Sequence, residues 1–282
     1  MWAQGQETVH PEGILVEAGR IERQYWKDLV RYRELFYFLA WRDILVRYKQ
    51  TVIGILWAVL RPFLTMVILT IIFGKLAKFP SEGAPYPILV FAAMLPWQFF
   101  ANALTECSNS LVGNINLISK VYFPRLIIPS SAVIVSLVDF LISGMLMVGL
   151  MIWYDFWPTW RVLALPLLTM LAVVAASGAG VFISALNVKY RDFRYIVPFI
   201  VQIGLYISPV GFSSSVVPEK WRLLYSINPM VGVIDGFRWA ILGKDVPLYL
   251  PGFFISIGLV SLLFLVSIWY FRRTERTFAD VI

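Results

Sequence analysis

Six long apolar segments constrain this 282-residue chain more than any other feature of its sequence. They cover residues 52–77, 86–105, 126–154, 162–186, 196–210 and 248–271. A straight helix needs about 20 apolar residues to cross the hydrocarbon core of a bilayer. Only 15% of the residues are charged, whereas soluble domains carry about 25%. The polar surface is too small to cover a soluble fold. We therefore predict an all-α polytopic membrane protein with six transmembrane helices.

The basic residues are distributed unevenly around these segments. With six spans, both termini lie on one side, and that side carries 16 Lys and Arg residues against 7 on the other. Cytoplasmic loops of membrane proteins carry the excess of basic residues. We expect both termini in the cytoplasm. We also expect no cleaved signal peptide, because no short apolar core with a small-residue cleavage site precedes the first span.

The stretch before the first span has the pattern of an interfacial helix. Successive 100° steps from residue 37 to 48 place its aromatic and aliphatic side chains on one arc, and Arg42, Arg47 and Lys49 lie off that arc. We predict a basic amphipathic helix over residues 34–50, lying in the cytoplasmic interface. A water-exposed helix packed on the protein itself is the alternative. Residues 1–33 are assigned to a cytoplasmic tail.

A second structured stretch outside the spans covers residues 218–243. Asn228 followed by Pro229 is a good helix start, and Gly243 is a plausible stop. The helix between them would be roughly 20 Å long at 1.5 Å per residue, too short to span. It is also too apolar for a loop in water. We predict a re-entrant or membrane-capping helix there, with a shorter partner helix over residues 218–224.

Sequence motifs for catalysis are absent. No G-x-x-x-x-G-K-[ST] phosphate loop, nucleophile elbow or H-E-x-x-H pair occurs. The single cysteine, Cys107, and the single histidine, His10, can form neither an internal disulfide nor a zinc site. We expect the chain to be no enzyme and to bind no cofactor or metal itself.

Ionisable residues inside the spans are the default functional candidates, and only Arg61 and Asp139 lie well inside one. Arg61 either snorkels to the cytoplasmic interface or contacts an anionic substrate headgroup. Asp139 is expected to make a structural hydrogen bond or a buried pair, with Arg61 as a candidate partner. So few buried charges argue against an ion-coupled secondary transporter.

Aromatic residues inside spans and kinks suggest a sugar path. Lipid contact or helix packing is the ordinary explanation for each of them. An aromatic face also stacks on pyranose rings without requiring one hydroxyl pattern, which suits a sliding polymer. With Arg61, the candidates for lining a channel are Trp57, Phe63, Trp97, Phe99, Phe100 and Tyr206.

Four segments together resemble the permease subunit of type 2 ABC exporters for polysaccharides, which include O-antigen, capsule and teichoic acid systems. They are ELFYFLAWRDILVRYKQTVIGILWAVLRP (34–62), NLISKVYFPRLIIP (116–129), NVKYRDFRYIVPFIVQIGLYISP (187–209) and NPMVGVIDGFRWAILG (228–243). The resemblance covers nearly the whole chain from residue 34 onward and marks 34–282 as one exporter transmembrane domain.

The resemblance implies a homodimer with two copies of a separate ATPase, which would bind ATP and magnesium. It implies a multi-pass protein of the bacterial inner membrane that exports a lipid-linked polysaccharide, with O-antigen favoured over capsule or teichoic acid. A cytoplasmic coupling helix that docks in the ATPase maps to residues 114–123. An ordinary polar loop is the alternative there. The contact residues would be Asn114, Asn116, Leu117, Ser119, Lys120, Tyr122 and Phe123, with Asn114, Asn116 and Ser119 as capping and polar-contact residues.

The family's extracytoplasmic gate helices map to residues 218–243, with Trp221, Phe237 and Trp239 as gate residues. The family usually has a less charged residue at the position of Arg61, so Arg61 would reflect a particular substrate. One rival is an ABC permease for a drug, antibiotic or haem. Those relatives often carry a large outer domain, whereas the first outer loop here has about ten residues (78–87). A membrane-embedded glycan- or lipid-modifying enzyme is another rival, but it would need clustered polar catalytic groups.

Overall fold

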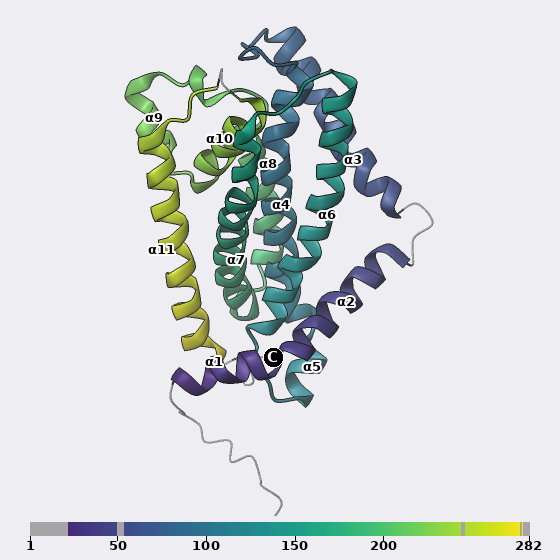
Figure 1. The fold of residues 1–282 in the computed structure, drawn as a ribbon. Helices are drawn as coiled ribbons and strands as arrows, with labels where there is room; N and C mark the ends of the chain where they lie inside the picture. Colours follow the sequence, from purple (N-terminus) through teal and green to yellow (C-terminus); the bar gives the residue numbers. More distant parts are fainter. Residues whose placement is uncertain (1–21, 50–53, 244–245, 277, 279–282) are drawn as a thin grey trace, which may run out of the picture.

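The structure is a computed structural model that describes residues 22–49, 54–243, 246–276 and 278. Within these residues the chain is helical and forms no strand, which confirms the all-α prediction (Figure 1). The helices are α1 (Glu22–Arg31), α2 (Arg33–Lys49), α3 (Gly54–Leu69), α4 (Tyr86–Gly113), α5 (Ile115–Lys120), α6 (Ile127–Trp153), α7 (Leu165–Lys189), α8 (Phe193–Ile207), α9 (Glu219–Tyr225), α10 (Pro229–Leu242) and α11 (Leu250–Glu275). A π-helix, η1 (Thr70–Leu76), extends α3, and two short 3-10 helices are η2 (Trp160–Ala164) and η3 (Ser214–Val216).

Among the described residues, five helical segments are long and apolar enough to cross a membrane. They are Leu56–Leu76, Tyr86–Gly113, Ile127–Trp153, Trp160–Lys189 and Leu250–Glu275. They correspond to five of the six segments expected from the sequence. The sixth, residues 196–210, corresponds to α8, which is apolar but only 15 residues long.

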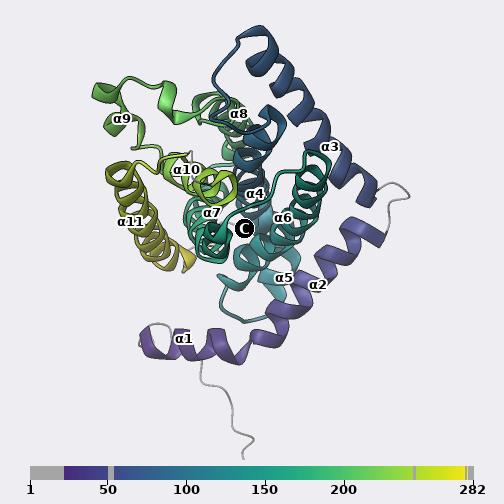
Figure 2. The ribbon, with the colours of Figure 1, turned by 45° about the horizontal axis from the view of Figure 1, so that its top comes forward.

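Helix α4 is the centre of the bundle. In its most apolar stretch 78% of the residues are buried, against 17–28% in the other four. It packs against α3, α6, α7, α8 and α10, and Figure 2 shows these helices gathered around it. A Cβ on Gly180 of α7 would lie 2.7 Å from Cys107 of α4. Small residues allow helices to approach closely in membranes, so Gly180 sets the spacing between α4 and α7.

Helix α3 is the most peripheral span. Only 17% of its apolar stretch is buried, and it stands away from the bundle beside α6 (Figures 1 and 2). It continues as the π-helix η1 toward the end that carries α9 and α10. Single π-helical turns inside α-helices occur frequently at functional sites. A Cβ on Gly74 of η1 would lie 2.9 Å from the Tyr86 ring, so η1 lies closely against the start of α4.

The two ends of the bundle have different contents, and Figure 1 shows both. The lower end carries α1, α2, α5 and the last turn of α11. There the Arg272 guanidinium lies 4.6 Å from the Tyr25 ring centre, and the Arg125 backbone N–H donates to Glu275 at 2.7 Å. The upper end carries α9, α10 and the end of α6. The first and last described helices therefore meet at one end.

The boundaries of α10 match the sequence prediction. The Asn228 side chain accepts a hydrogen bond from the Met230 N–H at 3.0 Å, and Pro229 is the first helical residue. Gly243 ends the helix with a φ of 89°, which favours glycine because it has no Cβ. In contrast, α1 lies within residues that were assigned to a tail. The expected interfacial helix 34–50 corresponds to α2, and its last residue lies outside the described residues.

Candidate functional site

The expected coupling segment, residues 114–123, lies at the lower end between α4 and α6. Its centre is α5, which follows α4 after one residue. The side chains of Asn116, Ser119, Lys120 and Tyr122 are exposed, whereas Phe123 is buried in the core with only 4% of its surface exposed. Leu117 is half-buried. The segment thus presents a polar and aromatic surface outward, and Phe123 anchors it to the bundle.

Asn114 does not cap α5, contrary to the expectation that it is a capping residue. Its side-chain amide N–H donates to the Ser110 carbonyl at 2.9 Å, and its side-chain oxygen accepts from the Arg42 guanidinium at 3.1 Å. The backbone at Asn114 continues almost directly from α4 into α5, so the side chain bonds back to the preceding turn. The result is a direct link between α2 and the coupling segment.

A second link joins α2 to α4 and α6. The Arg47 guanidinium lies 2.9 Å from the Asp139 carboxylate of α6 and 3.0 Å from Glu106 of α4. The Tyr48 hydroxyl donates to the same Asp139 carboxylate. Burial and this carboxylate both raise the pKa of Tyr48, so the phenol stays a donor.

The expectation that Asp139 makes a hydrogen bond or a pair is confirmed, but Arg61 is not its partner. Asp139 is satisfied by Arg47 and Tyr48, which the end of α2 brings to α6. Arg61 is exposed, and its side chain makes no ion pair or hydrogen bond within the described part of the chain. The sequence cannot show that α2 packs against α6 and brings Arg47 to Asp139.

The structure divides the aromatic candidates into two groups. Trp57 (57% exposed) and Tyr206 (60%) are exposed on α3 and α8, and Phe63 (38%) lines a groove between α3 and α6. Trp97 (5%) and Phe99 (1%) are buried, and Phe100 is half-buried. Neither Trp97 nor Phe99 is at the surface of the chain. The reason is the central position of α4, which carries both.

The buried aromatic residues have packing roles that the structure defines. A Cβ on Gly204 of α8 would lie 2.5 Å from the Trp97 ring, so that ring fills the contact between α4 and α8. The Phe99 ring centre lies 5.7 Å from that of Phe140, which in turn lies 6.1 Å from Phe237. Edge-to-face packing of this kind joins α4, α6 and α10 in one cluster.

The expected gate residues also differ in burial. Trp221 on α9 is exposed, Phe237 on α10 is fully buried, and Trp239 is half-buried. The Arg161 guanidinium lies 5.0 Å from the Trp239 ring centre and donates to the Gly243 carbonyl at 2.7 Å. Trp239 thus helps to hold the end of α10 against η2. Of the three residues, only Trp221 is exposed.

A polar cluster beneath α9 was missed by sequence reasoning. Arg238 of α10 is 1% exposed and donates to the carbonyls of Phe212 (2.7 Å), Val210 (3.0 Å) and Leu89 (3.3 Å). The loop after α8 is thereby tied to α4. Asp235, one turn earlier on α10, is outside the candidate spans. Its desolvation by the protein raises its pKa to about 6, although Arg238 opposes this. The signal available was a pair of charges at i and i+3 on an otherwise apolar helix.

No group of three or more potential metal ligands lies together among the residues that the structure describes. Cys107 is buried against Gly180 of α7, so its role is packing between α4 and α7.

Most of the chain is similar to known membrane transport proteins. Residues 34–242 match the family model described as ABC-2 type transporter. The chain is 27% identical over 259 residues to the O-antigen export system permease protein RfbA of Myxococcus xanthus, a match that covers 91% of this chain and 98% of that protein. It is 26% identical over 256 residues to the protein of the same name from Klebsiella pneumoniae, covering 88% and 95%. The polysialic acid transport protein KpsM of Escherichia coli is 22% identical over 244 residues, covering 84% and 90%.

Proposed function

This chain belongs to the ABC-2 type transporter family, and on that premise we propose that it is the membrane-spanning permease subunit of an exporter for lipid-linked polysaccharide. O-antigen is the favoured cargo, and the membrane is the bacterial inner membrane. The observation that carries the proposal is the end-to-end similarity to permeases named for O-antigen export. The chain is a transport subunit and no enzyme. ATP and magnesium would be bound by a separate ATPase, since this sequence has no phosphate loop.

The second cargo class is a capsular polymer, and the similarity to a protein named for polysialic acid transport favours testing a polysaccharide other than O-antigen. The two are separated by the polymer that is lost when the gene for this chain is deleted from its own host. Loss of surface O-antigen with retention of polymer inside the cell would support the first. Loss of capsule with normal O-antigen would support the second. Normal surface levels of both polymers would contradict polysaccharide export.

The proposed topology has six spans, with α8 as the fifth. Asn187 at the end of α7 donates to the Ser108 carbonyl near the end of α4, at 2.8 Å. Beyond α8, the Gly211 carbonyl accepts from Tyr86 at the start of α4, also at 2.8 Å. Tyr86 and Ser108 are separated by about 33 Å of helix rise, which is close to the thickness of the hydrocarbon core. Helix α8 and its flanking residues carry the chain over that length.

With an even number of spans, the 16-to-7 distribution of basic residues favours cytoplasmic termini. The lower end is then cytoplasmic, and α9 and α10 form the outer gate region. Reporter fusions after Ala84 and after Tyr154 should both report the outer side. A cytoplasmic signal at either position would contradict this topology.

We assign ATPase contact to the coupling segment. Closure of the partner would move α5, and the Arg42–Asn114 hydrogen bond would transmit that movement to α2 and onward to α3. Single cysteines replacing the exposed Asn116, Ser119 or Tyr122 should crosslink to the ATPase, and one replacing the buried Phe123 should not. Absence of crosslinks from all three exposed positions would contradict the assignment.

The conduit is proposed to run between two copies of the chain. The supporting observation is that Trp57 of α3 and Tyr206 of α8 are exposed, whereas Phe63 lines the groove between α3 and α6 and is left out of this surface. Flat aromatic faces bind sugar rings weakly and without one fixed hydrogen-bond pattern, which a moving polymer requires. The buried Trp97, which packs against Gly204 of α8, would support this surface from behind.

A further inference from the structure

The groove between α3 and α6 at the upper end has the chemistry of a binding site for one lipid. It has a volume of about 850 Å³, which lies in the upper part of the range for ligand pockets. Its walls come from α3, η1, the start of α4 and the last turns of α6. Fourteen residues line it.

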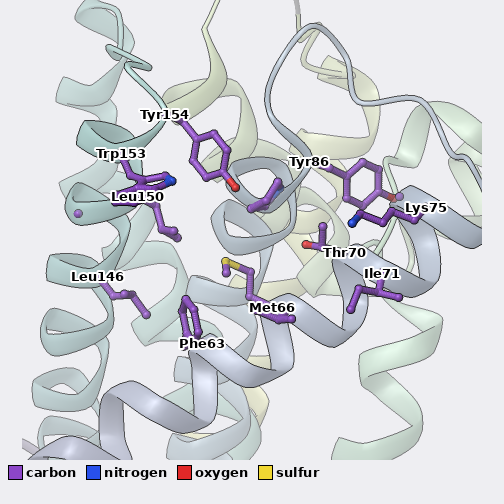
Figure 3. Close-up of a pocket in the computed structure, with 14 residues that line it drawn as sticks. Phe63, Met66, Thr70, Ile71, Lys75, Tyr86, Leu146, Leu150, Trp153 and Tyr154 are labelled. Carbon is purple, nitrogen blue, oxygen red and sulfur yellow. The ribbon is translucent and has the colours of Figure 1, made fainter.

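The polar and apolar groups of this groove are separated along its length. Figure 3 shows the Lys75 ammonium, the Thr70 hydroxyl and the Tyr154 hydroxyl directed into the same space near the upper end. Phe63, Met66 and Leu146 line the opposite part, toward the middle of the bundle. One polar end and one apolar end are the requirements of an amphiphile.

Two of these polar groups have unused bonding capacity. The Thr70 hydroxyl oxygen is buried and has no hydrogen-bond partner among the described residues, although buried hydroxyls are normally bonded. It lies at the first residue of the π-helix, in a groove wall. Lys75 makes no ion pair within the described part of the chain. Both groups can donate to an anion that enters between them.

The charges of the lining select among lipid headgroups. Lys75 is the one charged residue of the fourteen, so the groove matches a single negative charge. A diphosphate would bring at least two charges. A headgroup with its own ammonium would meet Lys75 without any lining carboxylate to bind it. A phosphodiester with an uncharged, hydroxylated headgroup fits best.

We propose that this groove binds one phosphatidylglycerol-type phospholipid, with its phosphate at Lys75, Thr70 and Tyr154 and an acyl chain along Phe63, Met66 and Leu146. In the proposed topology the polar end lies at the outer interface and the apolar end toward the midplane. This is the orientation of a lipid in the outer leaflet. The lipid fills the space that α3 leaves beside α6, and it holds the most weakly packed span in place.

The test measures lipid binding to the full chain purified in detergent, by native mass spectrometry during titration with phosphatidylglycerol or phosphatidylethanolamine. The intact chain should bind one phosphatidylglycerol about tenfold more tightly than phosphatidylethanolamine. Lys75→Gln should remove this difference, because a charge-assisted contact at a partly exposed site is worth about a factor of ten. Lys78→Gln is the matched control, since Lys78 is three residues away and does not line the groove.

Thr70→Val gives an independent variant that removes only the hydroxyl and keeps the shape. It should weaken phosphatidylglycerol several-fold. Equal binding of both lipids by the intact chain, or unchanged binding by Lys75→Gln, would overturn the proposal. Displacement of phosphatidylglycerol by a lower concentration of a polyprenyl diphosphate would do so too, because the occupant would then be a substrate anchor. Crosslinking of two copies through cysteines at Ile71 and Trp153 would make the groove a protein interface instead. None of these measurements depends on which polymer is exported.

Discussion

The contact between Trp97 and Gly204 offers a direct test of how α8 is held. Gly204→Ala would place a Cβ 2.5 Å from the outermost carbon of the Trp97 indole and 3.0 Å from the next. Real Cβ atoms do not approach that closely, and Trp97 is 5% exposed with Phe100 beside it at 5.9 Å between ring centres. The ring therefore has little room to move. Overpacking of this kind costs about 1–3 kcal/mol.

Trp97→Phe removes the part of the ring that Gly204→Ala would strike. Alone it should cost about 1–2 kcal/mol, less than the ~3–5 kcal/mol of truncation to alanine. The double variant should be more stable than the sum of the two single effects by at least about 1 kcal/mol, because each change relieves the other. The free energy of unfolding can be measured by SDS titration in mixed micelles.

Gly258→Ala is the matched control, because a Cβ there has no neighbour within 4 Å. It should be neutral or stabilise by up to about 1 kcal/mol. Additive effects in the double variant, or no cost for Gly204→Ala, would refute the claim that the indole sets the spacing of α4 and α8. The same series separates folding from transport, since Trp97 variants should lose export only as far as they lose stability.

Three further predictions address other parts of the molecule. Trp57→Ala should lower export while protein level and partner ATP hydrolysis stay normal, and Trp57→Phe should be milder; equal losses would contradict stacking on sugars. Asp139→Asn should lower the free energy of unfolding by about 1–3 kcal/mol, less than a fully buried pair costs, because Arg47 is 32% exposed and keeps Glu106; Glu106→Gln should cost less than about 1 kcal/mol. Asp235, with its pKa raised to about 6, binds a proton more readily in the folded state. As the pH rises from about 4 to about 6, the stability of the parent protein relative to Asp235→Asn should therefore fall, and above about pH 7 it should stay level. The melting temperatures of the two proteins measure this difference.

The sequence predicted those features that depend on local chemistry. The ends of α10 could be assigned because Asn228, Pro229 and Gly243 act on their own backbone. The apolar segments could be assigned because a bilayer requires length and hydropathy. By the same length criterion, the segment 196–210 was the shortest of the six predicted spans. In the structure the corresponding helix, α8, is apolar but too short to meet that criterion.

Features that depend on tertiary packing were out of reach. Hydropathy does not show which span the others surround, so Trp97 and Phe99 could not be told apart from the exposed Trp57. The partner of Asp139 lies 92 residues earlier in the chain, and only the rise of α2 alongside α6 brings Arg47 to it. In the sequence, Arg238 was counted among the 7 basic residues of the outer side. Its role depends on three backbone carbonyls from two distant segments.

The central position of α4 has a consequence for how the chain is made. Of the five candidate spans it has the lowest mean hydropathy, yet it is the second to leave the ribosome. The helices that later cover it, α6, α7, α8 and α10, do not yet exist at that moment. Its Ser108 carbonyl must wait for Asn187, some 79 residues downstream, before their hydrogen bond can form. Until α7 is inserted, α4 must be held by the insertion machinery or by α3. A chain interrupted before α7 would lack both the hydrogen-bond partner of Ser108 and the later helices that bury α4.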